Sequence, residues 1–424
     1  MDAPGPHVAV DDIDISDIEF WVRPPAEREA AFAMLRAERP LAWFEDPEIP
    51  NPIIPRGPGY WAVTRYADVL EASRNPEVFC SGKGAVSIAD FPPEMNEFYG
   101  SMISLDDPRH ARLRRIVSAG FTPKMLKRLE DSVQRVASEI VDGVRDRGEC
   151  DFVTDVAAAL PLRIICDMMG VPAAHYDRLF QLSNIVLSMG DPEYVPEGED
   201  VVVAFLNAGA ELAAMVQDLG AYRREHPTDD LTSALVHASV DGETLDQAEL
   251  GSFFILLVVA GNETTRTAIS HTLHLLTEHP DQRAIWMADV ERVTPTAVEE
   301  VVRCATPVIW MRRTATRDTT LGGRPVGEGD KLLLFYNSAN RDEAVFADPY
   351  AFDVLRSPND HVGFGGPGPH HCLGAHLARR EITVMWRELF RRLPDIAATA
   401  EPDRLRSSFI NGIKHLPCAW SVRA

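Results

Sequence analysis

Cys372 stands where a glycine-rich segment meets a segment typical of a helix. The residues before it, from His361 to His371, include four glycines, and the residues from Ala375 to Glu381 predict a helix. A thiol at the start of a helix lies near the positive end of the helix dipole, which favours the metal-binding thiolate. Glycines let the backbone come close to a large flat ligand. This pattern indicates haem, with Cys372 as its axial thiolate.

Two other interpretations of Cys372 stay open from this segment alone. A lone cysteine after glycines can be an inert, buried thiol in a turn. Zinc is a weaker alternative, because the adjacent His370, His371 and Cys372 cannot easily close around one tetrahedral ion. The chain also has no second pair of ligands at finger-like spacing.

A second unusual segment lies inside a long proline-free stretch, Asp246 to Glu278, which predicts a central buried helix of about 45 Å. Its middle, from Ala260 to Thr265, carries glycine, a carboxylate and two hydroxyls where a buried helix favours leucine. One explanation is a close helix crossing at Gly261, with the hydroxyls bonded back to their own turn. The chemical explanation is an oxygen site, since bound dioxygen needs two protons from an acid and an alcohol.

The cysteine segment resembles the ligand loop of the cytochrome P450 family, in which a basic residue stands two before the cysteine and a glycine two after it. His370 and Gly374 match this pattern. The family's aromatic residue stands seven before the cysteine, whereas Phe364 is eight before it and Gly365 takes the seventh place. The loop is therefore one residue longer, as in a lipid- and sterol-oxidising branch of the family.

The resemblance implies a mainly α fold with a minor β part, the cytochrome P450 fold, in which a long central helix passes over buried haem b. It assigns the acid and the alcohol to Glu263 and Thr264, and the oxygen groove to Ala260 and Gly261. Family members that use peroxide commonly lack the acid and alcohol pair, so the pair favours a monooxygenase.

Haem carries two propionates, whose burial needs cations or hydrogen-bond donors. His110 and Arg114, four residues apart, match a family pattern, although by themselves they read as surface charges. Arg313 aligns with a strand arginine of the family, and Arg312 is the less favoured alternative. The full set of expected cofactor contacts is His110, Arg114, Ala260, Gly261, Arg313, Phe364, His370, Gly374 and the iron ligand Cys372.

Glu300 and Arg303 match the family's ExxR motif, a structural ion pair behind the haem. Glu299 is also within helical reach of Arg303, so spacing alone cannot choose between them. The usual third member of this cluster is an arginine where this chain has Ala351. Arg341 or Arg356 could take its place.

Helical spacing of apolar residues predicts further helices over Arg128 to Asp146 and Gly198 to Glu225. Short strands are expected over residues 60–64, 314–316 and 331–336. No linker or repeat divides the 424 residues, so we expect a single cytochrome P450 domain over 1–424, with an acidic segment over residues 1–20.

The start of the chain lacks the basic and apolar regions of a secretion signal. The longest apolar run, Phe253 to Ala260, is far shorter than the ~20 residues that span a bilayer. Six cysteines without close pairing suit a reducing compartment. We therefore expect a cytoplasmic protein without a transmembrane segment.

A net charge of −22 argues against a nucleic-acid partner. Basic residues nevertheless cluster in two segments, and a solvated helix face is the commoner meaning of such a run. In the family these segments border the face where an acidic ferredoxin docks, so the resemblance implies a ferredoxin fed by an NAD(P)H-dependent reductase. The residues are Arg109, Arg112, Arg114, Arg115, Lys124, Lys127, Arg128, Arg379 and Arg380.

The segments that form the substrate pocket in this family are apolar here, although any single residue among them can be ordinary core. They carry no charge that would hold a polar substrate, which favours an apolar lipid, terpenoid or steroid. The candidate pocket residues are Phe98, Met102, Leu257, Ala260, Val308, Trp310 and Phe409.

Gly100 to His110, Ala260 to Arg266 and the extended cysteine loop resemble actinobacterial members that hydroxylate methyl-branched lipids and sterol side chains. We expect a monooxygenase that inserts one oxygen atom of O2 into a C–H bond. Terminal hydroxylation of a methyl-branched fatty acid or isoprenoid is the main expectation, and sterol side-chain hydroxylation is the second. A haem-based sensor or oxygen carrier is the alternative from another class; the thiolate and the Glu263/Thr264 pair favour the enzyme.

Overall fold

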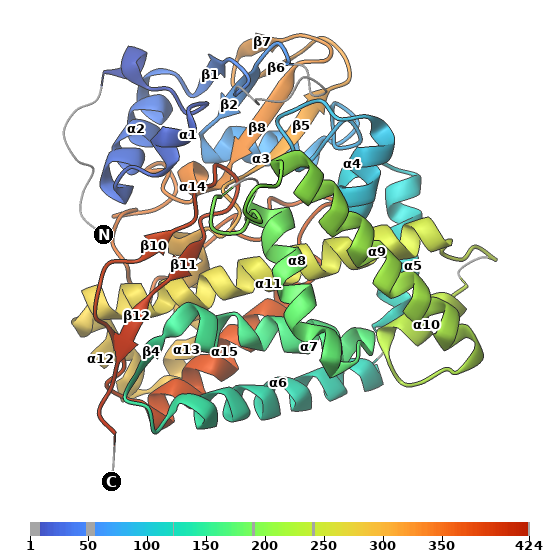
Figure 1. Ribbon diagram of the computed structural model, residues 1–424. Helices are drawn as coiled ribbons and strands as arrows, with labels where there is room; N and C mark the ends of the chain where they lie inside the picture. The colour runs from blue at the N-terminus through green and yellow to red at the C-terminus, as the bar shows by residue number, and fades with distance from the viewer. Residues whose placement is uncertain (1–8, 48–55, 122, 189–190, 240–241, 423–424) are drawn as a thin grey trace. The chain divides into compact units, whose positions relative to one another are not determined.

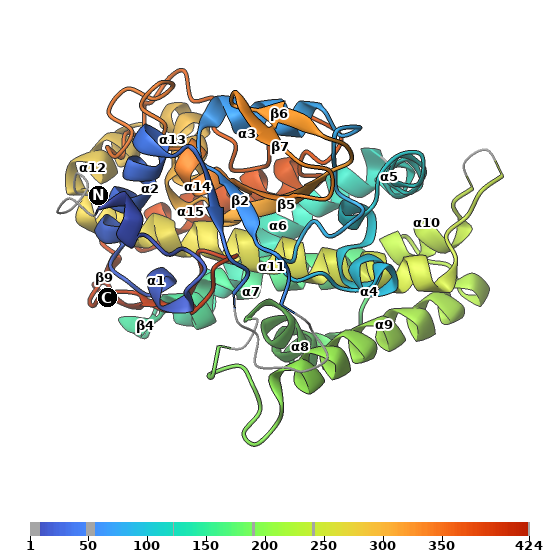
Figure 2. The same ribbon diagram turned by 90° about the horizontal axis from the view of Figure 1, so that it is seen from above.

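The computed structural model describes residues 9–47, 56–121, 123–188, 191–239 and 242–422. Helices dominate and the strands are short, which confirms the expected mainly α fold with a minor β part (Figures 1 and 2). The helices are α1 (Ile18–Trp21), α2 (Pro25–Glu38), α3 (Tyr66–Arg74), α4 (Pro93–Gly100), α5 (Arg109–Gly120), α6 (Pro123–Val144), α7 (Ala159–Met169), α8 (Tyr176–Ser188), α9 (Val201–Glu225), α10 (Leu231–His237), α11 (Gln247–Glu278), α12 (Pro280–Ala288), α13 (Val290–Ala305), α14 (Tyr336–Ala339) and α15 (Ala375–Arg392).

The strands are β1 (Leu41–Phe44), β2 (Tyr60–Val63), β3 (Phe79–Cys80), β4 (Glu149–Asp151), β5 (Trp310–Ala315), β6 (Thr319–Leu321), β7 (Arg324–Val326), β8 (Lys331–Phe335), β9 (Ala397–Ala398), β10 (Asp403–Arg404), β11 (Ile413–His415) and β12 (Pro417–Ala419). Single turns of tighter or wider helix lie at Val10–Asp12, Ser101–Ser104, Val153–Ala157 and Ala173–His175.

The chain forms two compact units, each assembled from separated segments. Unit 1 contains Met1–Pro93, His271–Ala375 and Arg404–Ile413; unit 2 contains Glu94–Ser270, His376–Asp403 and Lys414–Ala424. Because each unit interleaves distant parts of the chain, the expectation of a single domain stays a prediction.

A five-stranded sheet organises unit 1, in the order β1-β2-β8-β5-β3. The apolar run of β8 is buried along its whole length, between a parallel β2 and an antiparallel β5. Pairing with β8 extends β5 back to Trp310, beyond the expected 314–316, and places Arg312 opposite Leu333 and Arg313 opposite Leu332. Since successive strand residues point to opposite faces, the two arginines leave the sheet on different sides.

Helix α13 positions the ExxR residues in unit 1. Asp289 begins it by accepting a hydrogen bond from the backbone N–H of Arg292 at 3.2 Å. It ends at Thr306, whose φ of 35° is left-handed. Glu300 and Arg303 lie one turn apart inside this helix, so their side chains share a face.

Helix α11 is the central element of unit 2, to which it contributes its residues up to Ser270. Asp246 and Glu249 cap its start reciprocally, each side chain accepting from the other's backbone N–H at 2.8 and 3.1 Å. The helix covers the stretch predicted from the absence of proline. Helix α9 coincides closely with its predicted range, whereas α6 begins five residues before the predicted Arg128 and ends two before Asp146.

Helix α9 is long and apolar enough to cross a membrane, judged by length and composition. One such helix is weak evidence, since core helices of soluble proteins pass the same test. The expectation that the chain has no transmembrane segment stays a prediction.

Candidate functional site

The cysteine loop of unit 1 closes on itself around Cys372. The backbone N–H of Cys372 donates to the carbonyl of Phe364 at 3.0 Å, and the N–H of Gly365 donates to the carbonyl of Val362 at 2.9 Å. Asn340 holds the start of the loop by accepting from the N–H of Val362 at 2.7 Å. These hydrogen bonds close the loop between Phe364 and Cys372, and the Cys372 side chain remains exposed.

Two glycines of this loop are required by close packing against α3. A Cβ on Gly366 would lie 2.6 Å from the hydroxyl oxygen of Ser73, and one on Gly368 would lie 2.3 Å from the carbonyl oxygen of Ser73. Gly368 also has a φ of 145°, which L-residues rarely adopt. A Cβ on Gly374, in contrast, would meet nothing within 4 Å.

Arg313 is a buried cation whose charge has no carboxylate partner among the described residues. Its side chain is 5% exposed, and its Nη1 donates to the carbonyl of Arg312 at 2.7 Å. Burial raises the pKa of nearby Tyr336, and the Arg313 charge partly offsets this. A buried guanidinium without a carboxylate partner is stabilised when an anionic group of a ligand binds it.

Arg312 already has a carboxylate partner and several carbonyl partners for its terminal nitrogens. It donates to the carbonyls of Ser87, Ile88 and Ala89 at 3.2 to 3.4 Å and to the carboxylate of Asp90 at 2.7 Å. It therefore anchors the 87–90 segment, which leaves Arg313 as the arginine available to a ligand.

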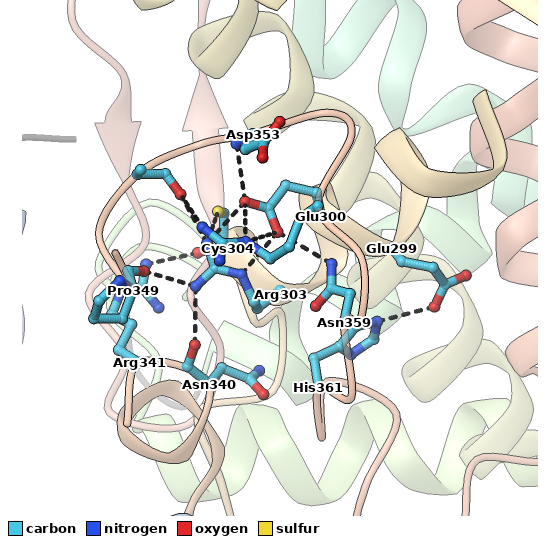
Figure 3. A network of polar contacts seen from close by, with 12 residues as sticks. Glu299, Glu300, Arg303, Cys304, Asn340, Arg341, Pro349, Asp353, Asn359 and His361 are labelled. Atoms are coloured by element: carbon cyan, nitrogen blue, oxygen red, sulfur yellow. Dashed lines mark hydrogen bonds and ion pairs between the residues drawn. The ribbon is translucent and has the colours of Figure 1, made fainter. Parts of the chain in front are cut away.

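Glu300 and Arg303 form a fully buried, bidentate ion pair at 2.8 Å (Figure 3). Arg303 also donates to the carbonyls of Asn340, Pro349 and Ala351. Burial alone would raise the pKa of Glu300, but the Arg303 hydrogen bond and charge hold that pKa below its usual range. Glu299 instead pairs with His361 at 2.9 Å.

Arg356 completes this cluster in place of the arginine absent at Ala351. Its Nε lies 3.1 Å from both Glu300 oxygens. Arg341 does not take this role: it pairs with Glu29 at 3.0 Å and donates to the carbonyl of Cys304 at 2.8 Å.

One face of α11 is partly exposed although most of the helix is buried. Most residues of this open stripe recur at three- or four-residue intervals, as expected for one side of a helix. They are Leu256, Leu257, Val259, Ala260, Gly261 and Thr264.

Both packing explanations for the unusual α11 residues are realised. The hydroxyl of Thr264 donates to the carbonyl of Ala260 at 2.7 Å, and a Cβ on Gly261 would lie 2.9 Å from Ile165 of α7. Packing thus accounts for the glycine. It does not account for Glu263, which is 1% exposed and lies off the open stripe, paired with Arg266.

His110 and Arg114 lie on α5, which begins directly after Pro108. His110 is buried, and its Nδ1 lies 3.1 Å from Asp107. Arg114 is half-buried. His370, from the cysteine loop of unit 1, is also half-buried.

The candidate pocket residues fall into two sets, one in each unit. In unit 1, the rings of Trp310 and Phe409 lie 4.9 Å apart, and half-buried Val308 pairs with Ile410. In unit 2, Met102 is buried, while Phe98 and Leu257 are half-buried. A groove of about 850 Å³ in unit 1, around Asp17 and Trp43, contains none of them.

Sequence reasoning missed two polar residues of unit 2. Arg266 binds Glu263 from one turn further along α11, a spacing visible in the sequence. Glu381 of α15 is buried and accepts a hydrogen bond from Thr265, and burial raises its pKa to about 8. No local pattern marks Glu381 as buried, because its helix carries charges on several sides.

The family model of cytochrome P450 matches residues 211–394 of the chain. A methyl-branched lipid omega-hydroxylase of Mycobacterium tuberculosis is 49% identical over 422 residues, which cover 99% of this chain and 97% of the relative. A steroid C26-monooxygenase of the same organism is 40% identical over 401 residues, covering 93% and 88%. The chain belongs to the cytochrome P450 family.

Solved cytochrome P450 structures agree with this assignment. A Mycobacterium marinum P450 in complex with pseudoionone is 44% identical, covers 98% of this chain and 99% of that one, and superposes with a TM-score of 0.90. A Bacillus megaterium P450 in complex with corticosterone is 28% identical, covers 95% and 100%, and gives a TM-score of 0.79. This P450 is a haem-thiolate monooxygenase that uses haem b, so the sensor or carrier alternative is set aside.

The residues of this P450 fit haem b. Arg313 is a buried cation that would receive a propionate charge, and the exposed Cys372 on its glycine-rich loop offers the thiolate. The open stripe of α11 supplies an uncharged surface of the kind a porphyrin and an apolar substrate need.

Proposed function

We propose that this P450 hydroxylates the terminal carbon of a methyl-branched fatty acid or isoprenoid. The observation that carries the proposal is the 49% identity, over nearly the whole chain, to a methyl-branched lipid omega-hydroxylase. The uncharged open stripe of α11, with Leu257 and Ala260 on it, supports an apolar chain as the substrate. Sterol side-chain hydroxylation is the second candidate, because steroid C26-monooxygenases are 40% identical.

In this proposal some of the predicted site residues hold the haem, and others shape the space around it. Cys372 would hold haem b, which would supply the activation of dioxygen. Arg313, His370, His110 and Arg114 bind the propionates. Phe364 and Gly374 shape the loop around the ligand, and Ala260 and Gly261 leave room beside it.

Thr264 and Glu263 handle protons. The Thr264 hydroxyl lies on the open stripe and donates to the carbonyl of Ala260, so its lone pairs remain available to a water or a ligand. Glu263 lies on the buried side of the same turn, where a carboxylate can pass protons toward that hydroxyl through water.

Electrons would come from a ferredoxin fed by an NAD(P)H-dependent reductase in the cytoplasm. The proposed docking face is narrower than the basic clusters of the sequence, because Arg109 pairs with Glu97 and Arg112 with Glu249. Arg115, Lys127 and Arg128 are exposed. Arg379 and Arg380 are half-buried, and the side chain of Lys124 lies outside the described residues.

The test is a titration of the ferric protein with branched fatty acids, isoprenoids and sterols, followed by product analysis with a surrogate ferredoxin and reductase. We expect a Soret shift and a terminal alcohol from the branched chains. A shift and a product with sterols alone would favour the second candidate, and no shift with any of these compounds would overturn the apolar pocket. The reduced carbon-monoxide complex should show the red-shifted Soret band of thiolate ligation.

A further inference from the structure

The proposed acid Glu263 is engaged on one side by a cation of its own helix. Its Oε2 accepts from Nη2 of Arg266, and both side chains are buried, at 1% and 3% exposure. Its Oε1 is buried without a hydrogen-bond partner in the described part of the chain. One oxygen is therefore held, and the other can still take a proton or a water.

Arg266 is in turn held by helix α8. Its Nη1 donates to the side-chain oxygen of Asn184 at 3.0 Å, and its guanidinium carbon lies 5.7 Å from the centre of the Phe180 ring. A second contact joins the helices next to this one, from the amide of Asn262 to the hydroxyl of Ser183 at 3.2 Å. Figure 1 shows α8 crossing α11 within unit 2.

A buried ion pair is stable only while both charges stay matched, because removal of one leaves an uncompensated charge in an apolar surrounding. The contacts from α8 to Arg266, made by Phe180 and Asn184, are uncharged, so they orient Arg266 without competing for its charge. Among the described residues, Tyr194 is a titratable group that interacts with both charges of the pair, and burial raises its pKa.

We propose that Arg266 is a positioning residue of the monooxygenase reaction: it compensates the charge of Glu263 and binds one of its oxygens, and helix α8 sets its place through Asn184. This inference rests on the proposed role of Glu263. The proposal makes α8 the element that controls the proton-delivering acid. A shift of α8 would change the contact between Asn184 and Arg266, and would therefore move Arg266 relative to Glu263.

Arg266→Gln tests the charge, because glutamine keeps hydrogen-bonding capacity but loses the cation. We expect Glu263 to become protonated, seen by infrared spectroscopy of the ferric protein as a carboxylic-acid C=O band that is lost again in Glu263→Gln/Arg266→Gln. This readout needs no substrate, so it stays valid if the proposed substrate is wrong. Arg266→Lys should show no such band.

Turnover provides the second readout. Product formed per NADH should fall about tenfold in Arg266→Gln, with a shifted pH profile and a larger solvent isotope effect, and Arg266→Lys should recover most of it. Asn184→Ala keeps the charge of Arg266, so it should move the pH profile less than Arg266→Gln does. This variant tests the link to α8 even if Arg266→Gln does not fold. Arg178→Gln, which removes the exposed α8 ion pair with Glu211, is the matched control and should change none of these quantities.

Two results would overturn the proposal. One is an ionised Glu263 in Arg266→Gln, and the other is an unchanged pH profile and coupling in both Arg266→Gln and Asn184→Ala.

Discussion

Arg356 donates from one nitrogen to both carboxylate oxygens of Glu300, 3.1 Å from each, although the two residues are 56 positions apart. Two arginines thus share one buried carboxylate, and Asn359 and the backbone of Asp353 complete its coordination at 3.1 and 3.0 Å. This cluster ties α13 to the segment that leads into the cysteine loop (Figure 3).

Arg356→Ala should destabilise the protein by about 3 kcal/mol, because it removes a charge partner from a buried carboxylate. Urea unfolding followed by haem absorbance measures this, and the variant should also retain less haem. Arg292→Ala is a control on the same helix: it removes an exposed pair with Asp289 and should cost much less, because solvent screens that pair. An equal loss in both variants would contradict the structural role of Arg356.

Thr264→Ala should still bind haem and substrate but lose coupling. Without the Thr264 hydroxyl, the bound dioxygen loses a group that helps deliver protons to it. The amount of product formed per NADH should therefore fall about tenfold, and the amount of hydrogen peroxide released should rise. Thr277→Ala is matched to it, since Thr277 makes the same back-bond on α11, to the carbonyl of Leu273 at 2.7 Å. Unchanged coupling in Thr264→Ala would remove Thr264 from the mechanism.

Arg313→Gln should weaken haem binding, whereas Arg312→Gln should mainly loosen the 87–90 segment. The reason is that Arg313 is buried without a carboxylate partner in the described chain, while Arg312 has Asp90. Transfer of haem to apomyoglobin measures the difference, and we expect about tenfold faster loss from Arg313→Gln. Equal rates in the two variants would show that the propionates use other groups.

Glu381→Gln should change how stability depends on pH. Burial raises the pKa of Glu381 to about 8, against about 4.3 in an unfolded chain. The folded state therefore binds one more proton between these values, so stability falls as pH rises from about 4.3 to about 8 and is level above that. The variant lacks this loss and should gain roughly 3 kcal/mol relative to the natural protein between pH 5 and pH 8.

Thermal unfolding at several pH values tests this, with Glu211→Gln as the control. Hydrogen bonding to Arg178 lowers the pKa of Glu211, so its contribution is lost only at acid pH and should be level between pH 5 and pH 8. A pH profile of Glu381→Gln that parallels the natural protein would mean that Glu381 is ionised in the folded state.

Much of the fold could be predicted because its signals are local. The central helix follows from a proline-free apolar run, and β8 follows from its unbroken apolar run. The extent of β5 could not be predicted, because pairing with β8 rather than its own composition makes Trp310 to Arg313 a strand. The partial exposure of the open stripe of α11 could not be predicted either, because it depends on which other segments pack against each side of the helix.

The sequence by itself determined which chemical groups this P450 has: a cysteine on a glycine-rich loop, an acid beside an alcohol in a buried helix, and an ExxR pair. Spacing along one helix or loop is enough to reveal these. Only the tertiary structure decided which long side chain meets which distant partner: Arg356 rather than Arg341 at Glu300, and Arg266 at Asn184. Arginine side chains reach several candidates, and the choice depends on which distant segments folding brings within a few ångströms.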